Sequence, residues 1–333
     1  MPEIFFMLVV FAVILALIFD FGNGLNDAAN AIAAVVATGA LPLWGAVLLA
    51  AIGNFGGVFI FGVAVATTIA KGIVNPSIVD AYMILGGLTG SIFWVYFASY
   101  KGIPVSASHA LIGGFVGAAI TKAGFGALKI FGILKVIAFI FIAPILGMVG
   151  GFLLFALVMW IFRRSDPKKT NRWFRRLQLI SASSYAITHG ANDAQKTMGI
   201  ISILLFSSGF LGDEFFVPFW VILASYLVIA LGTFAGGWKV IKTMGVKLTK
   251  LMPVHGFCAE SAGSLVLAFT SIMGIPVSTT HVIAGSIIGV GATRRLSSVR
   301  WSLARGILWA WILTMPAAAV VSGLSYTLIS FFI

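Results

Sequence analysis

The feature that most constrains this chain is a series of long apolar stretches that fills most of its 333 residues. Each stretch approaches or exceeds the roughly 20 apolar residues that a membrane-spanning helix needs. Charged residues make up only 9% of the chain, whereas a soluble domain has about 25%. The chain is therefore predicted to be an all-α, polytopic membrane protein embedded in a lipid bilayer.

Ten such stretches form two groups of five. The predicted spans are 4–38, 42–66, 78–100, 104–121 and 130–162, followed by 179–206, 216–238, 251–273, 276–292 and 302–331. The first and sixth spans contain a polar break. Gly22, Gly24 and Gly190 lie at these breaks, and glycine permits an unwound turn whose carbonyls would be free to bind a ligand.

The segment between the two groups, 163–178, is predicted to be a basic linker loop. Short loops rich in lysine and arginine stay in the cytoplasm. The linker divides the chain into a first transmembrane repeat, 1–162, and an inverted second repeat, 179–333. Five crossings on each side of the linker place both termini on the external side. The expected location is the cell (inner or plasma) membrane. The net charge of +12 then reflects membrane topology, and no nucleic-acid partner is expected.

Two polar motifs each occur twice, in the same order in both halves. The first motif is Gly-Leu-Asn-Asp-Ala-Ala-Asn at 24–30 and Gly-Ala-Asn-Asp-Ala-Gln-Lys at 190–196. The second is Gly-Ile-Pro-Val-Ser-Ala-Ser-His at 102–109 and Gly-Ile-Pro-Val-Ser-Thr-Thr-His at 274–281. Repeated motifs in halves of opposite topology indicate a secondary transporter, whose site forms from broken or re-entrant half-helices near the midplane.

The second motif predicts two helix N-termini that could hold an anion. Pro104 and Pro276 end one helix, and the hydroxyl residues after them favour the start of another. The unpaired N–H groups of such a start need a partner in lipid, and a tetrahedral oxyanion would provide one. Alternatively, the hydroxyls only cap their own helices. The candidate anion ligands are Ser106, Ala107, Ser108, Ser278, Thr279 and Thr280, together with Asn192 and Gln195 from the first motif.

The first motif predicts a cation site. A carboxylate at bilayer depth costs about 3 kcal/mol, so Asp27 and Asp193 are expected to be functional. Carboxylate, amide and backbone carbonyl oxygens suit a hard cation, and Na⁺ is expected at both aspartates. Such cations would cancel the repulsion between the acids and a bound anion, so each ligand would strengthen binding of the other. The candidate sodium ligands are Asn26, Asp27, Asn30, Asn192, Asp193, Ser106 and Ser278.

Other buried polar residues are candidates for accessory or gating roles. Lys196 replaces Asn30 in the second copy of the first motif, where it could neutralise Asp193 or point at the anion. Glu260 lies in an otherwise apolar span and could bind an ion, gate the site or be a hydrogen-bonded core residue. His109 and His281 follow the candidate anion ligands and could titrate or serve as hydrogen-bonding struts.

These motifs resemble those of the inorganic phosphate transporter (PiT) family of sodium- or proton-coupled symporters. The duplicated Gly-Ala-Asn-Asp signature is matched at 24–30 and 190–196, and Gly-Phe-Cys-Ala-Glu at 256–260 is similar to a further family motif. The resemblance implies inorganic phosphate as substrate and a homodimer, with Na⁺ or a proton as the coupling ion. The asparagines around Asp27 favour co-transported Na⁺, and no other cofactor is expected. Asn54 stands where many relatives carry glutamate, so a carboxylate role is not expected there.

Three alternatives remain open at this point. A proton could replace Na⁺ as the coupling ion, and sulfate or another oxyanion could replace phosphate. A remote alternative is an intramembrane hydrolase that uses Ser108, His109 and Asp27, although no acyl- or phosphoryl-transfer motif accompanies them. The chain contains no Gly-x-x-x-x-Gly-Lys-Ser/Thr loop, which argues against ATP-driven pumping. A transporter, and not an enzyme, is therefore expected.

Overall fold

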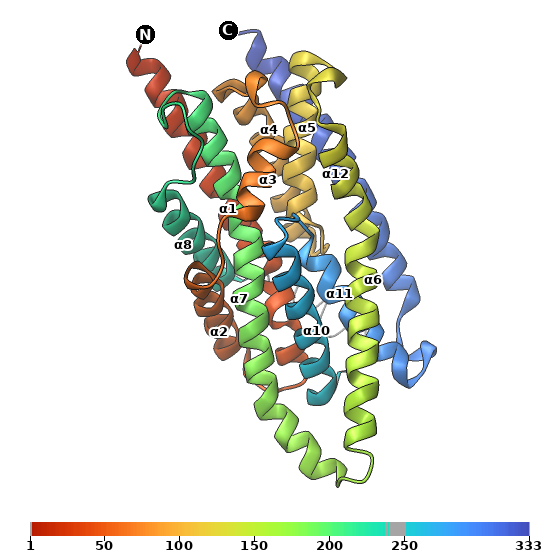
Figure 1. The fold of residues 1–333 in the computed structure, drawn as a ribbon. Helices are drawn as coiled ribbons and strands as arrows, with labels where there is room; N and C mark the ends of the chain where they lie inside the picture. Colours follow the sequence, from red (N-terminus) through yellow and green to blue (C-terminus); the bar gives the residue numbers. More distant parts are fainter. Residues whose placement is uncertain (1, 237–238, 240–250, 333) are drawn as a thin grey trace.

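Long helices run most of the length of the molecule in the computed structural model, which describes residues 2–236, 239 and 251–332 (Figure 1). The α-helices of the described residues are α1 (Pro2–Ala37), α2 (Leu43–Gly56), α3 (Ala64–Gly72), α4 (Ala81–Lys101), α5 (Ala107–Ala123), α6 (Ile130–Ile161), α7 (Pro167–Ser207), α8 (Phe219–Ala235), α10 (Pro253–Ile272), α11 (Thr279–Arg294) and α12 (Trp301–Ser330). Short 3₁₀ helices are Gly57–Phe59, Pro76–Ile78, Phe125–Ala127 and Leu296–Ser298.

Four of the described helices, α1, α4, α6 and α12, are long and apolar enough to cross a membrane, by length and composition. Large apolar side chains on their outer faces are exposed, among them Phe11 on α1, Phe141 on α6 and Leu324 on α12. In water such surfaces would aggregate, whereas in lipid they are solvated. The prediction of an all-α, polytopic membrane protein is confirmed.

The predicted span 42–66 differs from a single helix. α2 continues through the 3₁₀ turn to Phe59, and α3 starts at Ala64 after a bend of 81°. Together the two helices form a broken span or a re-entrant segment that α7 packs against. The predicted span 216–238 corresponds to α8, which ends at Ala235, and the last two positions of that span lie outside the described residues.

Four of the predicted spans correspond to helices that pair into two hairpins. α4 packs beside α5, and α10 packs beside α11. Figure 1 shows the α4–α5 hairpin in the half of the molecule that holds both termini, and the α10–α11 hairpin in the half that holds the α6–α7 connection. The predicted spans 78–100, 104–121, 251–273 and 276–292 thus form two hairpins that turn back in the interior (Figure 1), and of their helices α4 is long and apolar enough to be a candidate span. The predicted re-entrant half-helices are these hairpins.

The predicted polar breaks in the first and sixth spans are absent, because α1 and α7 continue through both copies of the first motif as unbroken α-helices. The glycines allow close helix packing instead of an unwound turn. A Cβ added to Gly24 would lie 2.3 Å from the carbonyl oxygen of Ile229 on α8. A Cβ added to Gly190 would lie 2.4 Å from the carbonyl oxygen of Asn54 on α2.

The basic segment 163–178 is mostly helical rather than a loop. α7 begins at Pro167, where the carboxylate of Asp166 accepts a hydrogen bond from the N–H of Lys168 at 2.8 Å. Asp166 is an N-cap and Pro167 occupies the first helical position, which is a favourable start for a helix. The connection between α6 and α7 is therefore short, and it lies at the opposite end of the molecule from the two termini (Figure 1).

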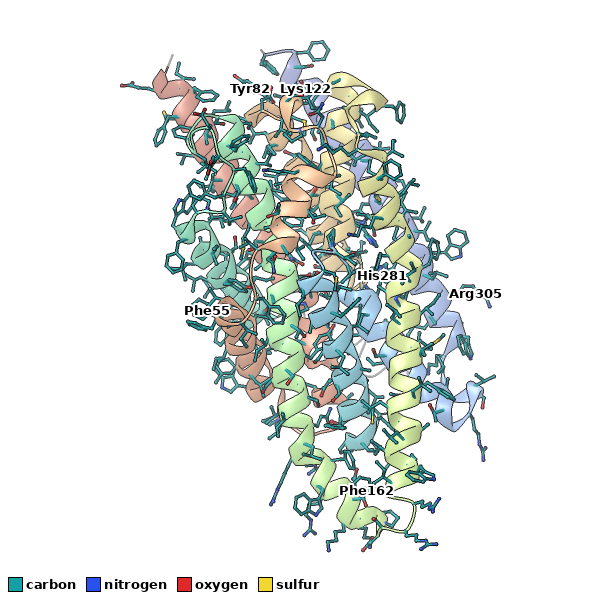
Figure 2. The ribbon with its side chains drawn as sticks, in the orientation of Figure 1. Phe55, Tyr82, Lys122, Phe162, His281 and Arg305 are labelled. Carbon is teal, nitrogen blue, oxygen red and sulfur yellow. The ribbon has the colours of Figure 1, made fainter. Side chains whose placement is uncertain are left out.

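Two apolar clusters enclose a polar layer at mid-length. One cluster includes Phe19 of α1 and Met198 of α7, and the other includes Ile32 of α1 and Tyr185 of α7. Both copies of the first motif lie on α1 and α7 between these residues. In Figure 2, His281 lies between Lys122 at one end of the molecule and Phe162 at the other. The hairpin tips thus meet in the interior, far from either end.

Candidate functional site

Asp27 lies on α1 beside the N-terminus of α11, among neutral partners. Its carboxylate accepts hydrogen bonds from Nδ2 of Asn26 at 2.7 Å and from the hydroxyls of Thr279 and Thr280 at 3.3 Å and 3.2 Å. Asn30, one helical turn further, donates its Nδ2 to the hydroxyl oxygen of Thr280 at 2.9 Å. All five side chains are at most 2% exposed. The first copy of the motif therefore holds a buried carboxylate whose hydrogen-bond partners among the described residues are all neutral.

Asp193, its counterpart on α7, lies against a lysine and a histidine. Nζ of Lys196 donates to Oδ1 of Asp193, and the hydroxyl of Thr279 donates to Oδ2 at 3.0 Å. Nε2 of His189 lies 3.2 Å from the same Oδ2. Lys196 is only 1% exposed. Of the two roles that the sequence leaves open for Lys196, the structure shows the first, an ion pair with Asp193.

The two aspartates are neighbours across the interface of α1, α7 and α11. The hydroxyl of Thr279 contacts both carboxylates. Ligand atoms of Asp27, His189 and Asp193 all lie within 4.8 Å of one another, an arrangement that could hold a metal ion. Two carboxylates this close repel strongly where the dielectric constant is low, so bringing them together favours a cation between or beside them.

Ser106 and Ser278 cap the helices whose N-termini reach this centre. The hydroxyl of Ser106 accepts a hydrogen bond from the N–H of His109 at 3.1 Å, and that of Ser278 accepts one from the N–H of His281 at 3.3 Å. The predicted helix starts after Pro104 and Pro276 and their capping are confirmed. A role for the two serines as ligands of phosphate or sodium stays a prediction.

The two hairpin tips contact each other reciprocally. The hydroxyl of Ser108 donates to the carbonyl of Val277 at 3.2 Å, and the hydroxyl of Thr280 donates to the carbonyl of Val105 at 3.3 Å. These are corresponding positions in the two copies of the second motif. Ala107, between Ser106 and Ser108, offers only its backbone N–H, which has no partner within the helix at this position. The backbone amides, carbonyls and hydroxyls of the two tips therefore lie close together in the interior.

The two remaining candidate anion ligands differ in where they lie. Asn192 donates to the hydroxyl of Ser271 at 3.1 Å, and its buried Oδ1 has no hydrogen-bond partner among the described residues. Gln195 accepts hydrogen bonds from the N–H groups of Val65 and Ala66 at the start of α3, and its Nε2 donates to the carbonyl of Ala191. The amide of Gln195 is therefore occupied in holding α3, and the structure does not bring it to the hairpin tips.

Glu260 belongs to a separate polar cluster between α7 and α10. Its carboxylate accepts hydrogen bonds from the hydroxyl of Ser181 at 2.6 Å and from Nε2 of Gln178 at 3.2 Å. Ser181 precedes Asp193 by twelve residues on α7, or about 18 Å at 1.5 Å per residue. The structure thus keeps Glu260 apart from the paired aspartates, so it is not a ligand of the same ion.

The two candidate histidines pack against each other at the hairpin tips. The ring centroids of His109 and His281 are 4.7 Å apart, and Trp311 of α12 stacks on His281 at 3.7 Å. The indole of Trp311 donates to the carbonyl of Pro104 at 3.2 Å. The hydrolase alternative needs His109 to activate Ser108, but the hydroxyl of Ser108 instead accepts a hydrogen bond from Lys196 and donates one to the carbonyl of Val277.

Sequence reasoning missed several residues of this centre. The carbonyls of Val105 and Val277 are contacts that no side-chain pattern reveals, although both residues lie inside the second motif. The hydroxyl of Tyr185 donates to the carbonyl of Thr279 at 3.1 Å, and Nδ1 of His189 lies 3.0 Å from Oδ1 of Asn54. The sequence indicates His189 only as a histidine that could titrate, directly before Gly-Ala-Asn-Asp at 190–193, and its contact with Asp193 could not be predicted.

This arrangement brings groups that suit a cation close to groups that suit an anion. Carboxylate, amide, hydroxyl and carbonyl oxygens suit a hard cation, and the amides at two helix N-termini suit an anion. Comparison with known proteins agrees with this chemistry, because the phosphate transporter family matches residues 23–322. The chain belongs to the phosphate transporter family.

Close relatives of this transporter cover almost its whole length. It is 51% identical over 321 residues to a protein of Rhizobium meliloti, spanning 96% of both chains, and 43% identical over 330 residues to one of Bacillus subtilis, spanning 98% of this chain and 99% of the other. Both relatives are named "Probable low-affinity inorganic phosphate transporter". The chain is a phosphate transporter and not an enzyme, and its helices place it in a membrane as a multi-pass protein.

A solved structure has the same fold. The chain superimposes with a TM-score of 0.91 on a structure titled "The sodium-dependent phosphate transporter", with 26% sequence identity over 98% of this chain and 100% of the other. At this similarity the helix arrangement described above is shared throughout.

Proposed function

We propose that this protein is a secondary-active symporter that imports inorganic phosphate together with Na⁺. The observation that carries the proposal is the position of Thr279, whose hydroxyl lies in the first turn of α11 and contacts both Asp27 and Asp193. The helix N-terminus suited to an anion and the paired acids suited to a cation therefore share one buried centre. Phosphate would lie between the N-termini of α5 and α11, with Na⁺ at the aspartates.

Charge links the two ligands. Phosphate placed beside two ionised carboxylates would be repelled strongly in a buried site. A cation bound at the carboxylates removes this repulsion, so each ligand raises the affinity for the other. This reciprocal dependence is the thermodynamic basis of symport: the empty site and the fully loaded site are favoured over a site that holds phosphate alone.

The proposed phosphate ligands are the backbone amides and hydroxyls of the two tips: Ser106, Ala107 and Ser108 on α5, and Ser278, Thr279 and Thr280 on α11. Asn192 joins them because its Oδ1 is buried and without a partner among the described residues, so it can accept the proton that phosphate still carries. Gln195 is left out, because its amide binds α3.

Sodium as the coupling ion is supported by the ligand set. The atoms around Asp27 are carboxylate, hydroxyl and amide groups, without sulfur. The structural neighbour is titled a sodium-dependent phosphate transporter. The proposed sodium ligands are Asn26, Asp27, Asn30, Asn192 and Asp193, with Ser106 and Ser278 at the helix caps.

Alternating access is proposed to arise from two inverted repeats, 1–162 and 179–333, that rock around this centre. The contacts of corresponding residues support this, since the hydroxyl of Ser99 donates to Asn26 at 3.1 Å and Asn192 donates to the hydroxyl of Ser271 at 3.1 Å. The two hairpins also enter from opposite ends (Figure 1). The α6–α7 connection is proposed to be cytoplasmic and the termini external. The homodimer, the cell-membrane location and gating by Glu260, His109 or His281 stay predictions.

The experiment that tests the proposal is ³²P-phosphate uptake into liposomes that contain the purified protein, with Na⁺ and pH gradients imposed separately. We expect uptake to follow an inward Na⁺ gradient and to be insensitive to a pH gradient alone. Uptake that responds only to the pH gradient would replace Na⁺ with a proton. Uptake that is indifferent to both gradients would contradict symport. Competition by sulfate in the same assay tests the choice of oxyanion.

A further inference from the structure

The two copies of the motifs place the same set of oxygen atoms around two positions in the centre. At the first position the set is the carboxylate of Asp27, the hydroxyl of Thr280 and the carbonyl of Val105. The hydroxyl of Thr280 lies 3.2 Å from the Asp27 carboxylate and 3.3 Å from the Val105 carbonyl. At the second position the corresponding set is the carboxylate of Asp193, the hydroxyl of Ser108 and the carbonyl of Val277.

At the second position these three oxygens surround the ammonium group of Lys196. Nζ of Lys196 contacts the Asp193 carboxylate, the hydroxyl oxygen of Ser108 at 2.5 Å and the carbonyl oxygen of Val277 at 2.8 Å. An ammonium group has three donors and a single positive charge, and all three donors are used here. The group thus makes the contacts that a monovalent cation would make in the same oxygen set.

At the first position the residue that corresponds to Lys196 is Asn30, which is neutral. Its Nδ2 contacts the hydroxyl of Thr280, while its Oδ1 is buried and has no hydrogen-bond partner among the described residues. The first position therefore offers a carboxylate, a hydroxyl, a carbonyl and a spare amide oxygen. These are the ligands that Na⁺ prefers, and no cationic side chain contacts them in the described part of the chain.

We infer that Lys196 is a built-in cation that permanently fills the second of two related cation positions, so that only the position at Asp27 takes up a transported Na⁺. This inference rests on the proposed function, because it assigns the cation sites of that symporter. It revises the expectation of Na⁺ at both aspartates.

The charges of the centre support one Na⁺ at this pair of positions. The carboxylates of Asp27 and Asp193 carry two negative charges, and the ammonium of Lys196 cancels one of them. A single Na⁺ at Asp27 then balances this pair of carboxylates before phosphate binds; the further buried acid Asp20, which accepts a hydrogen bond from Thr197 at 2.9 Å, is not part of the pair. With a neutral residue in place of Lys196, two sodium ions would be needed to balance the same pair, so this one side chain takes the place of one sodium ion.

A reciprocal exchange of the two residues tests the inference. Equilibrium binding of ²²Na⁺ to the purified protein, without phosphate, is counted for the wild type, Lys196→Asn, Asn30→Lys and the double exchange Asn30→Lys/Lys196→Asn. We expect Lys196→Asn to bind one more Na⁺ per chain than the wild type, Asn30→Lys to bind one fewer, and the double exchange to return to the wild-type number. In uptake assays the Hill coefficient for Na⁺ should rise in Lys196→Asn.

The outcomes separate this inference from the proposed function. Wild-type protein that binds no ²²Na⁺ would refute sodium coupling itself. Wild-type binding that stays unchanged in number in folded Lys196→Asn would overturn the inference alone and leave sodium coupling intact. If Lys196→Asn does not purify as a folded protein, Asn30→Lys decides: loss of one bound Na⁺ supports the inference, and an unchanged number overturns it.

Discussion

Asp27 and Asp193 occupy corresponding places in the two copies of one motif, but their surroundings differ in charge. Asp27 contacts an asparagine and two threonines, whereas Asp193 contacts a lysine, a histidine and one of the same threonines. The backbone around both is alike, since α1 and α7 are unbroken and each aspartate faces a hairpin tip.

This difference shows that the same helix arrangement can place either a bound ion or a lysine side chain beside the carboxylate. A carboxylate with neutral partners has to acquire a cation from solution, and its affinity then depends on the ion concentration. A carboxylate paired with a buried lysine is already balanced, and breaking the pair leaves an uncompensated charge. The following predictions test the two aspartates against each other.

The largest effect is expected from Asp193→Asn, which leaves Lys196 buried without its carboxylate. Breaking a buried ion pair by removing one partner costs about 3–5 kcal/mol. The unfolding temperature of the purified protein in Na⁺-free buffer should therefore fall sharply. The matched variant Asp27→Asn breaks no ion pair among the described residues, so it should keep its stability but lose the stabilisation that added Na⁺ gives the wild type. Equal destabilisation of both variants would contradict the comparison.

A smaller effect on stability is expected from Gln195→Leu. The variant removes the oxygen that accepts from the N–H groups of Val65 and Ala66. An unsatisfied buried donor costs about 1–3 kcal/mol. The unfolding temperature should fall while the Michaelis constant for phosphate in the remaining folded protein stays near the wild-type value. A large rise in that constant, with unchanged stability, would restore Gln195 as a phosphate ligand.

Thr279→Ala removes the hydroxyl that contacts both carboxylates and gives the position the residue found at Ala107, its counterpart in the first hairpin. Hydrogen bonds to charged groups contribute about 1.5–3 kcal/mol, and 1.4 kcal/mol corresponds to a factor of 10 in affinity. Half-saturation for Na⁺ should rise at least about tenfold by this arithmetic. Thr279→Ser is the matched control and should stay close to the wild type. An unchanged sodium affinity in Thr279→Ala would show that the bridge is only structural.

The smallest effect is expected from Ser99→Ala, compared with Ser271→Ala in the other hairpin. Each serine makes one hydrogen bond to the asparagine of its motif copy, and a neutral hydrogen bond contributes about 0.5–1.5 kcal/mol. Asn26 also contacts Asp27, so Ser99→Ala should weaken sodium binding by a few-fold, as ²²Na⁺ binding can measure. Ser271→Ala should leave it nearly unchanged, since the Asp193 side is fixed by Lys196. Equal effects of the two variants on sodium binding would contradict the difference between the Asp27 and Asp193 sides.

Much of the centre could be predicted from the sequence because its residues lie in repeated motifs. Asp27, Asp193 and the residues of both second-motif copies are polar groups in apolar stretches, where the cost of burial implies a partner. The proline and serine pattern gave the starts of α5 and α11 and the caps at Ser106 and Ser278. One of the wrong predictions concerns glycine, because Gly24 and Gly190 suit an unwound turn and a close helix contact equally well until the neighbouring helix is known.

The positions of Gln195, Glu260 and the hairpins could not be predicted, because they depend on distances between segments that are far apart in the sequence. Gln195 follows Asp193 by two residues and shares its motif, but the helical rotation directs its amide to α3. Glu260 is buried and acidic like the two aspartates, and only its contacts with Gln178 and Ser181 separate it from them. The hairpins could not be told from pairs of spanning helices, because hydropathy records how apolar a segment is and not how deep it goes.

The sequence by itself determined that this chain belongs in a membrane, that two polar motifs each occur twice in the same order, and that acids and hydroxyls occur at matching places in the two copies. These follow from composition and order along the chain, which lipid solvation constrains directly. Only the tertiary structure decided that both hairpin tips converge on the two aspartates and that one of these acids is already paired with Lys196. The physical reason is that charge balance depends on which groups lie within a few ångströms of each other, and segments distant in the chain supply those groups.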